Sequence, residues 1–233
     1  MDRTESNGVR VKGRDCWWTV LVIDPLAGPL VRAVYPFAWI TPNVITAASV
    51  VVAAAAAAAF ALGWLVAGAL LFQLSFLLDC TDGKLAWTRN LVSSHGSYVD
   101  AIGDAMRFVM CTGALVYSLA SSETTGPGWV ALFALFPTIH YAILTTGAAW
   151  PKRPGANGPL TVRASPLAFL RAAPQRLSKP GTTVETEALA FTIGPIVGVP
   201  LYGVLAATAI DALRLTLTAA IRTREALRAG GSS

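Results

Sequence analysis

No charged side chain occurs between Arg32 and Asp79, and this is the feature that most restricts the fold. A helix needs about 20 mostly apolar residues to cross a bilayer, so the stretch is long enough for two spans. Hydrophobic side chains make up 54% of the 233 residues and charged ones 13%, and the mean hydropathy is +0.56. This composition excludes secreted, fibrous and disordered classes, and the three cysteines show neither a disulfide framework nor zinc spacing. The chain is predicted to be all-α, an integral membrane bundle.

Turn-forming residues divide the apolar sequence into candidate spans. Gly63 separates the first two spans, and Ser121–Gly128 separates the third from the fourth. A polar, proline-rich segment follows at Pro151–Val184, and the last two helices join near Gly198–Gly203. We predict six transmembrane helices, which lie at Asn43–Leu62, Trp64–Leu78 running on toward Trp87, Tyr98–Ala120, Trp129–Trp150, and as a pair within Glu185–Arg228. The predicted organisation is an N-terminal segment (1–42), a membrane domain (43–228) with an inner loop (151–184), and a tail (229–233).

Basic residues predict the orientation. All 18 of them fall in Met1–Pro42, Lys84–Ser97, Pro151–Val184, the C-terminal tail, or the adjoining helix ends. Cytoplasmic loops hold an excess of Lys and Arg, so both termini and the active site are expected on the cytoplasmic side of the cell (inner or plasma) membrane. Topology and anionic lipids account for the net charge of +5, and no nucleic-acid partner is expected. The first 15 residues lack the apolar core of a signal peptide, so no cleavage is expected.

The segment Trp17–Ile40 mixes tryptophans and aliphatic residues with charges and three prolines. This mixture is typical of a helix that lies in the headgroup region and does not span the bilayer. Trp17 and Trp18 are the expected interfacial anchors, because tryptophan is enriched at that depth. We therefore predict an N-terminal interfacial amphipathic helix ahead of the first span.

Four aspartates form the main chemical pattern. Asp79 and Asp82 share a face at the end of the second span, and Asp100 and Asp104 share a face at the start of the third. If the two helices are neighbours, four carboxylates converge at one membrane depth, where they would repel one another strongly without a cation between them. Oxygen ligands without His or Cys point to Mg²⁺ or a similar ion that also binds phosphate. Gly83, next to Asp82, lets a ligand or a backbone approach closely.

The run Asp79, Asp82, Gly83, Ala86, Gly96, Asp100, Asp104 resembles the signature of the CDP-alcohol phosphotransferases (CDP-alcohol phosphatidyltransferases) in residue type and spacing. The segment Thr41-Pro42-Asn43 with Thr46 is similar to that family's entry to its first helix. The resemblance implies a six-helix membrane enzyme that displaces CMP from a CDP-linked donor by attack of an acceptor hydroxyl on the donor's β-phosphorus. It also implies a homodimer, which the small residues of the spans would allow.

The same resemblance implies roles for single residues. Asp79, Asp82 and Asp100 would hold Mg²⁺ or Mn²⁺ on the donor diphosphate. Asp104 would be the general base and would also touch a second metal. The nucleotide site would be lined by Gly83, Ala86, Lys84 and Asn43. These roles suit phosphoryl transfer, which needs charge neutralisation, positioning and a proton acceptor.

One position departs from the family pattern: Trp87 stands where arginine usually follows the alanine. An indole has one N–H donor and no charge, so it does not replace a guanidinium on a diphosphate. Lys84 is nearer the face of Trp87 than Arg89 is, and it is the candidate for the missing charge. Three readings stay open: an active enzyme that uses Lys84, a shifted donor preference, and a protein without turnover.

Other residues have simpler interpretations. Arg107 is either an ion-pair partner of Asp104 or a ligand of an acceptor phosphate. His140 is expected to be a packed or hydrogen-bonded neutral histidine. Glu185 is expected to open the fifth helix, with Thr182 or Thr183 as its cap.

CDP-diacylglycerol is the expected donor, within a membrane of other lipids, and a polar alcohol or sugar phosphate is the expected acceptor, such as inositol phosphate or glycerol phosphate. The product would then be a phospholipid or another phosphodiester. A soluble CDP-alcohol donor or a specialised acceptor is the alternative within the same chemistry. The alternative from another class is a non-catalytic lipid- or cation-binding protein or a transporter, because intramembrane carboxylates also serve ion pathways.

Overall fold

The structure is a computed structural model that describes residues 8–121, 127–148, 158–178 and 182–230. It is all-α apart from one two-stranded antiparallel sheet. Its elements are, in chain order, β1 (Gly8–Lys12), the π-helical turn η2 (Thr19–Ile23), α1 (Asp24–Val34), α2 (Pro42–Ala61), α3 (Leu65–Thr88), α4 (Ser94–Ala120), α5 (Pro127–Ala148), β2 (Pro159–Arg163), α6 (Pro166–Arg176), α7 (Thr183–Ala188), the π-helical turn η3 (Leu189–Ile193), α8 (Gly194–Val197) and α9 (Pro200–Gly230).

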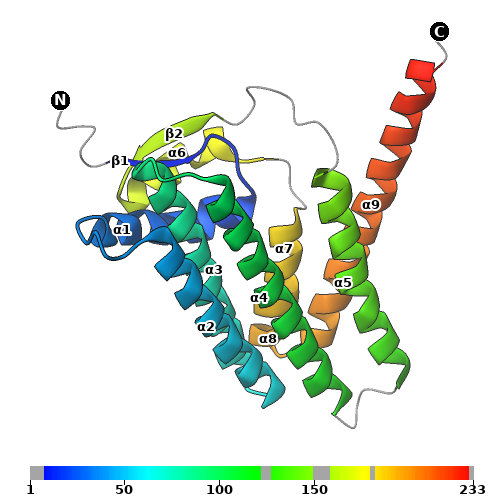
Figure 1. Ribbon diagram of the computed structural model, residues 1–233. Coiled ribbons are helices and arrows are strands. Elements are labelled where there is room, and N and C mark those ends of the chain that lie inside the picture. Colours follow the sequence, from blue (N-terminus) through cyan, green and yellow to red (C-terminus); the bar gives the residue numbers. More distant parts are fainter. Residues whose placement is uncertain (1–7, 122–126, 149–157, 179–181, 231–233) are drawn as a thin grey trace.

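Helices α2, α3 and α4 run side by side, and α5 packs against α9 (Figure 1). Helix α2 begins where the Thr41 hydroxyl accepts a hydrogen bond from the Val44 N–H. It ends before Gly63, whose φ of +75° suits glycine and turns the chain into α3. The ring of Phe60 fills the space beside Gly68 of α3, so the two helices approach closely. The predicted helix break at Gly63 is confirmed.

Three of the described helices are long and apolar enough to cross a membrane: Pro42–Ala61, Leu65–Thr88 and the part of α9 from Pro200 to Glu225. The predicted count of six spans stays a prediction, as do the orientation and the domain bounds. The break before the last helix falls at Gly198, which has a φ of +78°. It lies within Gly198–Gly203, the predicted junction of the last two helices. Parts of the predicted outer turn 121–128, of the inner loop 151–184 and of the tail lie outside the described residues.

The core of the bundle is rich in phenylalanine. Phe72, Phe108 and Phe136 surround Phe191 of η3, with ring centroids 4.8 to 6.0 Å from it. These rings join α3, α4 and α5 to the π-helical turn η3. Aromatic pairs at such distances contribute beyond their buried area, about 0.5–1.5 kcal/mol each. The bundle therefore holds α3 and α4, which carry the aspartates, in a fixed relation.

Outside the bundle, β1 pairs with β2, and α1 packs against α3 and α6 at the same end of the molecule (Figure 1). A helix does occupy the N-terminal segment, and its placement in the headgroup region stays a prediction. The two tryptophans predicted as anchors also bond within the protein. Trp17 Nε1 donates to the carbonyl of Ser178 at 2.8 Å, and Trp18 Nε1 donates to Gln73 Oε1 at 3.0 Å.

Candidate active site

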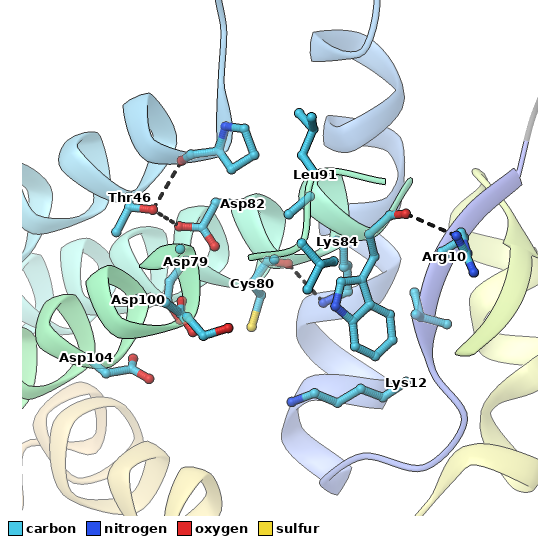
Figure 2. Close-up of a pocket in the computed structure, with 18 of the residues that line it drawn as sticks. Arg10, Lys12, Thr46, Asp79, Cys80, Asp82, Lys84, Leu91, Asp100 and Asp104 are labelled. Carbon is cyan, nitrogen blue, oxygen red and sulfur yellow. Dashed lines mark hydrogen bonds between the residues drawn. The ribbon is translucent and has the colours of Figure 1, made fainter. Parts of the chain in front are cut away.

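Asp79, Asp82 and Asp100 lie together, as their spacing predicted (Figure 2). One carboxylate oxygen from each lies within 4.8 Å of the others. Asp79 and Asp82 are on the buried face of α3 near its end, and Asp100 is in the first turns of α4. Both helices bring their carboxylates to the same end of the bundle because a short connection joins them.

The surroundings of these carboxylates fit a hard divalent cation. The Thr46 hydroxyl of α2 lies against Asp82 Oδ2 and also reaches the carbonyl of Pro42 at 3.1 Å. Asp79 Oδ1 is buried and accepts no hydrogen bond from a described residue, and its charged neighbour is Arg107, with Nη1 at 3.4 Å. Three like charges at this separation repel one another in a medium of low dielectric constant, and a bound cation relieves that repulsion. The arrangement is therefore a candidate metal site with oxygen ligands only.

Asp104 lies outside this group of three. Its carboxylate pairs with Arg107, one turn further along α4, and its side chain is half exposed. Arg107 is buried and also lies 3.4 Å from Asp79 Oδ1, so one guanidinium links two of the four predicted residues. Of the two roles predicted for Arg107, the ion pair with Asp104 is present in the structure. The predicted second-metal contact of Asp104 stays a prediction.

A pocket of about 590 Å³ opens beside the carboxylates. It is lined by all the residues predicted for catalysis, metal and nucleotide, namely Asn43, Asp79, Asp82, Gly83, Lys84, Ala86, Asp100 and Asp104, together with Trp87 and Gly96. A side chain added at Gly83 would meet nothing within 4 Å, so this glycine is not required by packing within the described part of the chain. The open space at Gly83 leaves room for a ligand against the backbone.

The ammonium of Lys84 is already paired. It lies 2.8 Å from Asp24 Oδ1 and donates to the carbonyl of Cys80 at 3.1 Å. Asp24 is fully buried in α1 and also pairs with Arg176 of α6 at 2.6 Å. Arg89, the other nearby cation, donates to four backbone carbonyls between Val34 and Ile40. Both cations near Trp87 are therefore already engaged within the protein.

Sequence reasoning missed a contribution from β1. Arg10, Val11 and Lys12 all line the pocket, and along the strand the buried Val9 and Val11 alternate with the less buried Gly8, Arg10 and Lys12. The signal was present, because this alternation is typical of a strand with one buried face. The strand is short, however, and its partner β2 is about 150 residues away in the sequence, so no local pattern indicated the pairing.

A second buried polar cluster lies outside the pocket. His140 of α5 contacts Asp211 of α9 at 3.1 Å and Glu187 of α7 at 3.2 Å, and its ring stacks on Phe108 at 4.3 Å. The Thr186 hydroxyl also lies 3.2 Å from Asp211. The predicted packing and hydrogen bonding of His140 are confirmed. The predicted neutral state fits less well, because a carboxylate oxygen lies at each ring nitrogen and a neutral imidazole has only one N–H donor. The capping box of α7 pairs Thr182 with Glu185, which confirms Thr182 as the cap.

An apolar helical bundle with acidic residues gathered in a pocket at its helix ends is typical of a membrane protein and forms a candidate site for a cation and a polar ligand. The family model for CDP-alcohol phosphatidyltransferase matches residues 39–194, and the chain belongs to that family. This family transfers phosphate-containing groups from CDP-alcohols and generally depends on a divalent metal. Comparison with curated proteins finds no match. The family model includes all four aspartates but begins after β1 and α1.

Proposed function

We propose that this chain transfers a phosphate-linked group from CDP-diacylglycerol to the hydroxyl of a polar acceptor such as inositol phosphate or glycerol phosphate, with release of CMP. The observation that carries the proposal is the convergence of Asp79, Asp82 and Asp100 beside a pocket large enough for a nucleotide. The acidic side chains lie at the ends of two consecutive helices, which suits a polar substrate at the membrane surface better than an ion pathway at mid-membrane.

In the proposed reaction the acceptor oxygen forms a bond to the β-phosphorus of the donor. The bond from that phosphorus to the oxygen bridging the two phosphates breaks, and CMP leaves with the bond electrons. Asp79, Asp82 and Asp100 would hold a divalent cation, which neutralises diphosphate charge when bound. The backbone at Gly83, which has open space beside it, would lie against the nucleotide, with Ala86 and Asn43 on the pocket wall.

Asp104 is the proposed general base. Its half-exposed carboxylate lines the pocket, so an acceptor hydroxyl can reach it. Arg107 holds one of its oxygens, which leaves the other oxygen to accept the proton. Arg107 thereby acts as a positioning residue, since it fixes the direction of the carboxylate.

The test is metal-dependent CMP release by the purified protein in detergent, with CDP-diacylglycerol and a panel of acceptors: inositol phosphate, glycerol phosphate, inositol and serine. We expect release with one acceptor, dependence on Mg²⁺ or Mn²⁺, and a loss of roughly 100-fold or more in Asp104→Asn. Glu225→Gln is the matched control, because it neutralises an exposed carboxylate at the far end of α9. Full activity in Asp104→Asn would refute the base assignment. If the wild-type protein neither releases CMP nor binds CDP, the result would favour the non-catalytic alternative.

A further inference from the structure

The pocket needs a cation that the bundle does not offer. Trp87 brings no charge to the pocket wall, and the ammonium of Lys84 is held by the buried carboxylate of Asp24. The carboxylates of Asp79 and Asp104 are matched with Arg107. A donor diphosphate carries several negative charges, and a single divalent ion neutralises only part of them. A further cation at the pocket is therefore expected on electrostatic grounds.

Strand β1 supplies two candidates, of which one is already used. The Arg10 backbone N–H donates to Thr88 Oγ1 at 3.1 Å, and its guanidinium donates to Asn90 Oδ1 at 2.6 Å. Asn90 has a φ of 56°, a conformation that asparagine tolerates well, and it ends the turn after α3. These bonds, with the ladder to β2, fix β1 against the end of the helix that carries the metal-site aspartates.

Lys12 lies two residues beyond Arg10 on the same side of the strand, at the pocket wall. Figure 2 shows its side chain extending from β1 toward the side of the pocket where the aspartates gather. The Lys12 ammonium forms no salt bridge or hydrogen bond with any described residue, although the backbone carbonyl of Lys12 accepts a hydrogen bond from Arg176 Nε at 3.3 Å. Among the basic side chains of the described pocket wall, it is the one whose ammonium has no partner.

We infer that Lys12 is a direct ligand of the donor diphosphate and replaces, from the N-terminal strand, the cation that Trp87 lacks. A lysine neutralises phosphate as a point charge, so it serves without the fixed geometry of a guanidinium. The strand fixes the position of Lys12 relative to the aspartates, because the hydrogen bonds of Arg10 hold β1 at the end of α3. The Lys12 side chain is not used in these bonds and stays at the pocket wall. The inference rests on the proposed function and adds to it a residue that lies before the segment the family model matches.

The test compares CDP binding by Lys12→Met, Lys12→Arg and Arg163→Gln, measured by calorimetry in detergent with saturating Mg²⁺ and no acceptor. Arg163→Gln is the matched control, because it removes an exposed positive charge from the paired strand, away from the pocket. We expect CDP affinity to fall roughly 10-fold or more in Lys12→Met and to stay within about three-fold of wild type in the other two variants. Lys12 is exposed, so the midpoints of thermal unfolding should agree among all four proteins.

Three results would be decisive. Unchanged CDP affinity in Lys12→Met, with wild-type binding intact, would overturn the inference and leave the proposed function standing. A raised acceptor KM in Lys12→Met with unchanged CDP affinity would also overturn it, because the lysine would then serve the other substrate. Absence of CDP binding by the wild-type protein would contradict the proposed function itself.

Discussion

The buried ion cluster of Asp24, Lys84 and Arg176 allows the sharpest prediction about stability. Asp24 is fully buried and neutralises two cations, at 2.8 Å and 2.6 Å, that come from different helices. Asp24→Asn keeps the shape of the side chain but leaves both cations without a charged partner. Breaking a buried pair by removing one partner costs about 3–5 kcal/mol. Lys84→Met should cost less, because Asp24 keeps its bond to Arg176.

The assay is thermal unfolding in detergent followed by tryptophan fluorescence. For a chain of this size, 3–5 kcal/mol corresponds to a fall in the midpoint on the order of 10 °C. Glu225→Gln is the control, since its exposed pair with Arg222 contributes less than about 1 kcal/mol. A midpoint for Asp24→Asn within about 2 °C of wild type would refute the reasoning. Lys84→Met should also retain CDP affinity; a stable Lys84→Met protein that fails to bind CDP would show that Lys84 contacts the donor after all.

Three further predictions concern the metal and nucleotide sites. Thr46→Val removes the hydroxyl that lies against Asp82, so the Mg²⁺ concentration needed for half-maximal CMP release should rise about 10- to 100-fold. Thr46→Ser keeps the hydroxyl and should stay within a few-fold of wild type. Equal Mg²⁺ requirements in the two variants would contradict a role of the hydroxyl in positioning Asp82. Mg²⁺ at about 100 times its Kd should stabilise the wild-type protein by about 2.7 kcal/mol, and an equal gain in Asp82→Asn would argue against this site. Gly83→Ala should weaken CDP binding and leave the unfolding midpoint unchanged, because the added Cβ meets nothing within 4 Å. Gly203→Ala should lower the midpoint, because its Cβ would lie 2.6 Å from the carbonyl oxygen of Leu189. Unchanged CDP binding in Gly83→Ala would exclude backbone contact of Gly83 with the nucleotide.

Much of the bundle follows from local properties of the sequence. The uncharged stretch predicts two helices, and Gly63 predicts the break between them because glycine readily adopts a positive φ. Gly63 does have a positive φ in the structure. The spacing of Asp79, Asp82 and Asp100 predicts one acidic cluster, since the two helices are consecutive and joined by a short connection. In each case the sequence pattern that supports the prediction lies within two consecutive helices.

The parts that sequence reasoning missed depend on contacts between distant segments. Asp24 meets Arg176 across 152 residues, and His140 meets Asp211 across 71. Neither pair has a spacing that local structure would fix, so the partners could not be deduced from periodicity. The ion pair of Lys84 with Asp24 is of the same kind, because Asp24 lies in a segment predicted only to rest on the membrane.

The ion pairs also explain why the additional cation should come from outside the bundle. A charge within an apolar helix is stable only when paired, and the partly buried Lys84 and the buried Arg107 and Arg176 are all held by aspartates. A cation needed by a ligand must instead stay unpaired until the ligand arrives, which is tolerable only where water reaches it. Lys12 meets that condition, because it is exposed on a strand that is itself fixed to the end of α3. The donor site is then completed by the N-terminal strand, so loss of the exposed Lys12 ammonium should alter CDP affinity without disturbing the helices.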